Sequence, residues 1–273
     1  MPDDPARAPD PAPARPRPGD PPSLVGLVAQ GVLDAEMAAI VWILVEARIP
    51  LVVATPAGRV AAGAQLLAGI LGSIHPDEDV VSLTAPLTPA GASALVRGRR
   101  AGGVVEAVSL AELRAGFLRG PLPLTKDQLT FLGTVLVLGE ADAGGAAGTG
   151  GADAAGSGGR RGRLRVTAAH YVRPLARDVH GHAQRLDPAV LATWDERLGR
   201  YEHFAWGVLP EIAARLGRRG GDLEADLHHR RDDLAGLARA GVTKLDEVRR
   251  LVAGYRVRYD GAHGDQHAGR PPH

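Results

Sequence analysis

The chain contains no cysteine, which excludes disulfide bonds, thiolate metal sites and cysteine nucleophiles. Aromatic residues make up only 4% of the sequence, so a folded core has to be built from aliphatic side chains. An excess of one charge is also absent, because 32 Lys and Arg residues against 31 Asp and Glu residues leave a formal charge of +1. This balance gives no general attraction to nucleic acid or anionic membranes, and we expect no nucleic-acid partner.

Long hydrophobic runs are missing as well. The longest uncharged apolar stretches, residues 37–45 and 61–74, are too short to cross a bilayer as helices. The N-terminus lacks the basic-then-apolar order of a secretory signal peptide. The sequence therefore predicts a soluble, cytoplasmic protein. Its 273 residues, 45% of them hydrophobic, are enough to bury a substantial core.

Three segments have compositions that do not favour a packed structure. Residues 1–22 are rich in proline and are predicted to form a disordered tail, although a proline-recognition peptide is an alternative. Residues 141–162 are almost entirely Gly, Ala and Asp and predict a disordered surface loop. Residues 258–273 form a second polar tail. A single folded domain is expected over residues 23–257.

Within this domain, apolar strands alternate with helical segments. Asp34 is a predicted N-cap, and Ser109 and Thr125 each open a predicted capping box. Apolar runs without polar alternation are typical of strands covered on both faces, as in a mostly parallel α/β sheet with flanking helices. Strands are predicted at residues 51–54, 79–83, 104–108, 134–138 and 165–171.

The C-terminal part has a different pattern. Residues 191–194 and 201–206 flank a turn and predict a β-hairpin. Helices are expected at 210–216, 223–240 and 244–255, and the leucine-rich faces of the last two predict an antiparallel helical hairpin.

The first predicted strand runs directly into Thr55-Pro56-Ala57-Gly58 and then into an apolar helix over residues 61–71. A phosphate-binding P-loop occupies this position and has the motif G-x-x-x-x-G-K-[ST]. Its backbone N–H groups surround the phosphates, its Lys neutralises them and its hydroxyl holds Mg²⁺.

This loop lacks the residues that hold phosphate and metal. Gly58 and Gly63 keep the glycine spacing, but Ala64 and Gln65 take the Lys and Ser/Thr positions. If the motif starts at Thr55 instead, Ala61 and Ala62 take those positions. Both registers therefore place alanine where the lysine belongs.

Together with its flanking segments, the loop resembles the ATPase domain of the type II/type IV secretion and type IV pilus superfamily, especially the branch of tight-adherence and archaeal pili. Residues 31–48 look like the helix before that family's P-loop. Residues 75–82, His-Pro-Asp-Glu-Asp-Val-Val-Ser, are similar to the run after the P-loop helix. Residues 104–110 fall where the family has T-I-H-A-D-S-L. The resemblance extends from residue 23 to residue 257.

The resemblance implies a P-loop NTPase-like fold, ATP and Mg²⁺ as ligands, and oligomeric rings. It also implies a secretion or pilus membrane platform as partner, and thus a peripheral position at the inner membrane. It identifies a vestigial nucleotide-binding loop of Thr55, Pro56, Ala57, Gly58, Arg59, Gly63, Ala64 and Gln65. No catalytic residue of the family is retained, and Glu106 stands where the family's histidine would be.

Three hypotheses follow from these departures. The first is a non-hydrolysing structural or regulatory subunit that packs against an active paralogue. The second is an active or weakly active ATPase in which Arg59, Arg99 or Glu106 replaces the lost groups. The third is an inert scaffold that recruits partners through the proline-rich tail.

Two histidine pairs have the spacing of metal ligands. These are His180 with His182 and His263 with His267. Neither pair has a convincing third ligand, so we predict no metal site.

Overall fold

The computed structural model describes residues 21–75, 81–82, 102–119, 124–141, 163–177 and 180–267. The proline-rich segment up to residue 20, residues 142–162 of the predicted loop and Arg99 lie outside this part of the chain.

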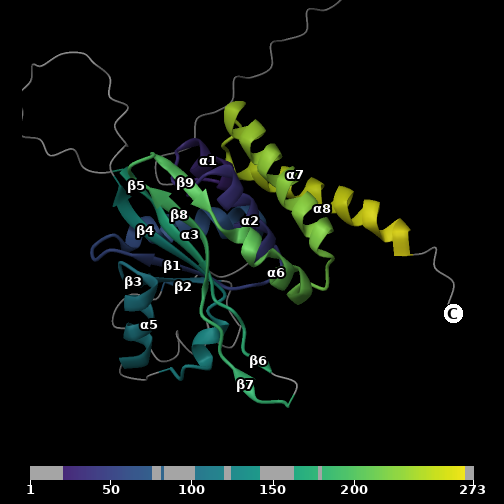
Figure 1. The fold of residues 1–273 in the computed structure, drawn as a ribbon. Coiled ribbons are helices and arrows are strands. Elements are labelled where there is room, and N and C mark those ends of the chain that lie inside the picture. Colours follow the sequence, from purple (N-terminus) through teal and green to yellow (C-terminus); the bar gives the residue numbers. More distant parts are fainter. Residues whose placement is uncertain are drawn as a thin grey trace, which may run out of the picture.

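A seven-stranded sheet forms the centre of the molecule, with strand order β2-β3-β1-β4-β5-β8-β9 (Figure 1). Two further short strands, β6 (Ala176–Arg177) and β7 (Ala183–Gln184), pair in a small separate sheet that projects away from the main one. The strands of the central sheet are β1 (Leu51–Thr55), β2 (Val81–Ser82), β3 (Gly102–Glu106), β4 (Thr134–Ala141), β5 (Arg163–Tyr171), β8 (Ala189–Asp195) and β9 (Arg200–His203).

The sheet is mixed rather than mostly parallel. β2, β3, β1 and β4 run parallel, whereas β5, β8 and β9 continue from β4 in antiparallel order. The mixed α/β class is confirmed, but the expectation of a mostly parallel sheet holds only for the first half. The physical reason is the type of connection. Helical crossovers such as α3 return the chain parallel, whereas the tight turn between β8 and β9 returns it antiparallel.

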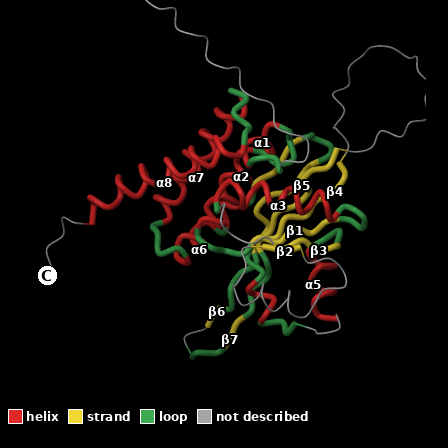
Figure 2. The backbone as a smooth tube through the Cα atoms, turned by 180° about the vertical axis from the view of Figure 1, so that it is seen from behind, coloured by secondary structure: helices red, strands yellow, loops and turns green. Residues whose placement is uncertain are grey.

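Helices cover both faces of the sheet (Figures 1 and 2). One face, with Val53, Val104 and Leu136, packs against α1 (Leu24–Ala29), α2 (Ala35–Glu46) and α3 (Val60–Ile74). The opposite face carries α5 (Leu110–Arg119), whose Leu113 and Phe117 are buried against the strands. α6 (Leu209–Arg215) adds Ile212 and Ala213 to the larger core.

Helix α2 is apolar all round, and its surroundings explain why. It begins after Asp34, whose Oδ1 accepts the Met37 N–H at 2.9 Å, so the predicted N-cap is confirmed. Every side chain from Met37 to Val45 is buried, because α7 (Gly220–Arg239) covers the surface of α2 that the rest of the core leaves free.

The predicted hairpin of α7 and α8 (Leu245–His267) differs from the observed packing. The two helices are joined by a turn at Gly241, which has a φ of +73°, but α7 packs on α1 and α2 while α8 packs on α3. The buried apolar residues of both helices belong to the same core cluster as those of α1, α2 and α3. The two helices meet where the Tyr255 hydroxyl donates to Asp226, and a cavity of about 290 Å³ lined by residues of both has Trp42 of α2 in its wall.

Helix α8 also continues past residue 257, where a polar tail was expected, and ends at His267. The sequence contains no proline between residue 210 and Pro271, so no residue in this stretch blocks the helix outright. No helix among the described residues is long and apolar enough to cross a membrane.

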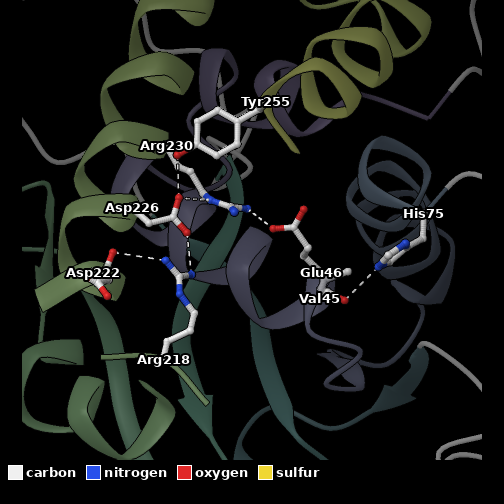
Figure 3. Close-up of polar contacts among 8 residues, drawn as sticks. All are labelled: Val45, Glu46, His75, Arg218, Asp222, Asp226, Arg230 and Tyr255. Atoms are coloured by element: carbon white, nitrogen blue, oxygen red, sulfur yellow. Dashed lines mark hydrogen bonds and ion pairs between the residues drawn. The ribbon is translucent and has the colours of Figure 1, made fainter. Parts of the chain in front are cut away.

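A buried ion network connects the outer helices to α2 (Figure 3). Asp226 on α7 is fully buried and accepts hydrogen bonds from Arg218 at 2.7 Å, Arg230 at 2.8 Å and the Tyr255 hydroxyl at 2.6 Å. Burial acts to raise the pKa of Asp226, but the bonds from Arg230, Tyr255 and Arg218 outweigh it and hold the pKa below its usual value.

The positive charge of Arg230 is balanced just as fully. Its Nη1 lies 2.6 Å from a carboxylate oxygen of Glu46, and its guanidinium lies over the rings of Trp42 and Tyr255, 4.4 and 4.8 Å from their centroids. Each buried charge in this network therefore has a partner of opposite sign, which is the condition for tolerating such groups in a core.

Candidate functional site

The vestigial loop lies at the centre of the sheet. β1 ends at Thr55 between β3 and β4, and both neighbours run parallel to it. In α/β sheets, ligands bind beyond the carboxyl ends of the parallel strands. This edge is therefore the first place to examine for a binding site.

The connection from β1 to α3 is a tight turn over residues 56–59. Gly58 has a φ of +74°, which favours glycine, and the Arg59 N–H donates to the Pro56 carbonyl at 3.0 Å. Pro56 is half-buried, and Ala57 and Gly58 are exposed. The helix starts at Val60, and Pro56 has no N–H, so the turn itself contributes only the N–H groups of Ala57, Gly58 and Arg59.

The second half of the vestigial motif lies inside α3. A Cβ atom on Gly63 would lie only 2.8 Å from Val104 Cγ1 and 3.3 Å from Thr55 Cγ2. Gly63 therefore allows α3 to approach the sheet closely. Ala64 is half-buried against the core and Gln65 is exposed. The structure thus divides the eight candidate residues among the end of β1, the turn and the helix.

Two carboxylates occupy the loop. The Gly58 N–H donates to Glu106 Oε1 at 3.1 Å, and Glu106 lies directly opposite Thr55 at the end of β3. The Arg59 guanidinium forms an ion pair with Glu140 at the end of β4. A backbone donor and the cation of the loop are thus already bound to acids of the chain itself.

The energetic effect of these acids on an anion is unfavourable. The Arg59–Glu140 pair is about half exposed, and such pairs contribute roughly 0–1 kcal/mol, so the pair itself is weak. A phosphate charge about 4 Å from one carboxylate would, however, be repelled by roughly 4 kcal/mol near a protein surface. The loop environment therefore disfavours phosphate even if Arg59 moves.

The structure brings together only part of the substitute set proposed from the sequence. Glu106 and Arg59 both lie at the turn, but Glu106 accepts the Gly58 N–H and Arg59 forms an ion pair with Glu140. Arg99 lies outside the described residues. Sequence reasoning missed Glu140. It follows the predicted strand 134–138, and the parallel pairing of β4 with β1 brings it to the loop.

The two histidine pairs lie in separate parts of the chain. The rings of His180 and His182 lie 6.1 Å apart between centroids in an exposed segment. Among the described residues no group of three His, Asp or Glu side chains could hold a metal ion. His263 and His267 lie in the last part of α8, where the side chains are not described.

No protein-family model and no curated protein matches this chain. The family assignment therefore remains a proposal that depends on the order of the sequence motifs.

Proposed function

We propose that this chain is a non-hydrolysing structural or regulatory subunit related to the secretion and pilus-assembly ATPases. One observation carries the proposal. The Gly58 N–H and the Arg59 side chain, which would meet a phosphate, are bound by Glu106 and Glu140. The α/β sheet with a strand–turn–helix at its centre fits this family, and the altered loop fits the loss of hydrolysis.

The chemistry of phosphoryl transfer supports the same conclusion. Hydrolysis needs positioned cations for the γ-phosphate, an anchor for Mg²⁺ and a group that orients water. The lysine and hydroxyl positions of the motif are Ala64 and Gln65, or Ala61 and Ala62, and none of these can supply such a group. Loss of one transition-state contact costs roughly 10²–10³ in rate, and several are missing here.

The direct test is Mg²⁺-dependent ATP turnover by the full chain and by Arg59→Met. The proposal predicts that both proteins stay at the level of the protein-free control. Turnover that requires Mg²⁺ and is abolished in Arg59→Met would show an ATPase that uses substitute residues, and would overturn the proposal.

A second test addresses the role as a subunit. The chain is mixed with an active ATPase of this superfamily that retains the P-loop lysine, and the turnover of that enzyme is measured together with co-elution in size-exclusion chromatography. A subunit role predicts a stable complex and a changed rate. Separate elution and an unchanged rate would contradict the proposal.

A further inference from the structure

A cleft at one end of β5 contains an arginine that forms no ion pair within the described part of the chain. Arg165 is only 6% exposed, and its Nε has no hydrogen-bond partner. Among the described residues no carboxylate forms an ion pair with it. A buried charge is costly unless it is paired, so this arrangement is unusual for a core residue.

The cleft is built by three separate parts of the chain. Arg165 comes from β5, Trp194 and Arg200 from the β8–β9 hairpin, and Gly31 and Asp34 from the turn between α1 and α2. It encloses about 540 Å³, which is enough for a small ligand larger than a single ion.

The aromatic wall of the cleft is fixed in place. The Arg165 guanidinium lies 3.6 Å from the centroid of the Trp194 ring, and Trp194 makes an edge contact with Tyr201 at 5.0 Å. The Tyr201 hydroxyl donates to the Val32 carbonyl at 2.9 Å, and the Val166 N–H donates to the same oxygen at 2.8 Å. These contacts therefore fix the positions of Trp194 and of the Arg165 guanidinium that lies on it.

A second buried donor of the cleft is also unpartnered. Trp194 Nε1 is buried and makes no hydrogen bond. Because the guanidinium of Arg165 is stacked on the indole, the N–H groups of Arg165 and Trp194 do not share one plane. Arg165 and Trp194 thus each carry a buried donor without an acceptor among the described residues, and a ligand with several acceptor oxygens would supply the missing acceptors.

The charges around the cleft favour an anion. Asp34 is the acid that lines it in the described part of the chain, and both of its oxygens are engaged, Oδ1 by the Met37 N–H and Oδ2 by His203 Nε2 at 2.7 Å. Arg163 and Arg200 are exposed at the rim and have no ion pair among the described residues; a Cβ on Gly31 would lie 3.9 Å from an Arg163 nitrogen.

We propose that this cleft binds the phosphate group of a small soluble ligand through Arg165 and Trp194, with Arg163 and Arg200 at the rim. Phosphate suits these donors because its tetrahedral oxygens accept hydrogen bonds from several directions and its charge matches the arginines. A planar carboxylate would pair with one guanidinium edge and leave the indole N–H unused. This site is separate from the loop after β1 and does not depend on the proposed function.

The test is calorimetric titration of the full chain with inorganic pyrophosphate, ADP and acetate. Pyrophosphate is expected to bind the wild type, and Arg165→Met to weaken binding at least about tenfold, the loss expected for one charge-assisted contact. The matched control is Arg177→Met, which removes an exposed arginine of the distant β6–β7 hairpin and should leave binding unchanged. Tighter binding of ADP than of pyrophosphate would identify a nucleotide as the source of the phosphate, and equal binding a phosphate group alone.

A second measurement distinguishes a loss of binding in Arg165→Met from a folding defect. Pyrophosphate should change the tryptophan fluorescence of the wild type and of Arg177→Met but not that of Trp194→Phe. Arg165→Lys, which keeps the charge and loses the flat stacking surface, should bind with intermediate affinity. Binding that is absent in the wild type, equal for acetate, or unaffected in Arg165→Met would overturn the proposal. None of these outcomes bears on Mg²⁺-dependent ATP turnover, which tests the proposed function separately.

Discussion

The loop after β1 and the cleft at β5 lie at the same end of the sheet, but their positive groups have opposite surroundings. β5 pairs with β4 so that Arg165 lies opposite Gly139, one residue before Glu140, the partner of Arg59. In the loop, carboxylates bind the cation and a backbone donor. In the cleft, the cation and the indole donor are not paired with an acid of the described residues, and the one acid that lines it, Asp34, bonds to Met37 and His203 instead. A loop at the expected place in a sheet is therefore insufficient evidence for anion binding, because neighbouring charges decide whether an anion is accepted.

Arg230 is a second buried arginine of this chain, and its role is to stabilise the fold. It is 3% exposed, close to the 6% of Arg165, and it also lies on a tryptophan ring. Unlike Arg165, it contacts two carboxylates, Asp226 and Glu46. The comparison between these two arginines, and between the cleft and the loop, can be tested by four substitutions.

The largest effect is expected for Asp226→Asn. The change leaves Arg218 and Arg230 facing a neutral amide in the core, and breaking a buried pair costs about 3–5 kcal/mol. Urea denaturation should show this loss, and Asp233→Asn, an exposed position on the same helix, should change stability by less than about 0.5 kcal/mol. A loss of stability below about 1 kcal/mol in Asp226→Asn would mean that the pairing of Arg230 with Asp226 does not stabilise the fold.

A smaller loss of stability is expected for Gly63→Ala. The added methyl group would overlap Val104, and overpacking costs about 1–3 kcal/mol, which exceeds the gain in helix propensity. Gly116→Ala in α5 is the matched control. Its Cβ meets nothing within 4 Å, so the same change should stabilise by up to about 1 kcal/mol. Equal effects at both positions would contradict a packing role for Gly63.

A pH-dependent effect is expected from His203. Burial acts to lower its pKa, but its hydrogen bond to Asp34 and the charges of Asp34 and Glu36 outweigh burial and raise the pKa above 6.5. The stabilisation is therefore fully present below the unfolded pKa of about 6.5 and is lost as the pH rises through the folded pKa. His203→Gln should cost about 1 kcal/mol at pH 5.5, a value reduced for the partial exposure of Asp34, and progressively less toward pH 9. A stability difference that does not change with pH would rule out the charged pair.

The smallest effect is expected for Arg165→Met in the absence of ligand. Removal of an uncompensated buried charge is favourable, whereas loss of the stacking on Trp194 is unfavourable, so the free energy of unfolding should change by less than about 1 kcal/mol. Thermal denaturation without and with pyrophosphate measures both states. A loss as large as that of Asp226→Asn would mean that Arg165 has a structural partner.

Local features of the fold were predictable from the sequence because short-range chemistry determines them. Asp34 caps α2 as predicted, and in the box of Ser109 with Glu112 the Ser109 hydroxyl accepts the Glu112 N–H at 3.1 Å. Thr125 and Gln128 exchange hydrogen bonds as predicted, although they open a short 3-10 helix. The direction of β5 and the partners of α7 depend on long-range packing, which periodicity does not report.

The candidate sites also depend on long-range packing that the sequence pattern does not report. The loop after β1 was found from the pattern of strand, turn and helix, but the role of Gly63 depends on its distance to Val104 in another strand. The cleft brings together Arg165, Trp194 and the turn at Gly31, which are far apart in the sequence. No local pattern indicates that Arg165 forms no ion pair among the described residues, because its surroundings depend on how distant segments pack together.

The most direct test of the difference between loop and cleft is calorimetric titration of Mg-ATP into the wild type, Arg59→Met and Arg165→Met under identical conditions. The account predicts that nucleotide binding is retained in Arg59→Met and weakened at least about tenfold in Arg165→Met. Binding that is lost in Arg59→Met and retained in Arg165→Met would place the phosphates in the loop after β1 and contradict the account.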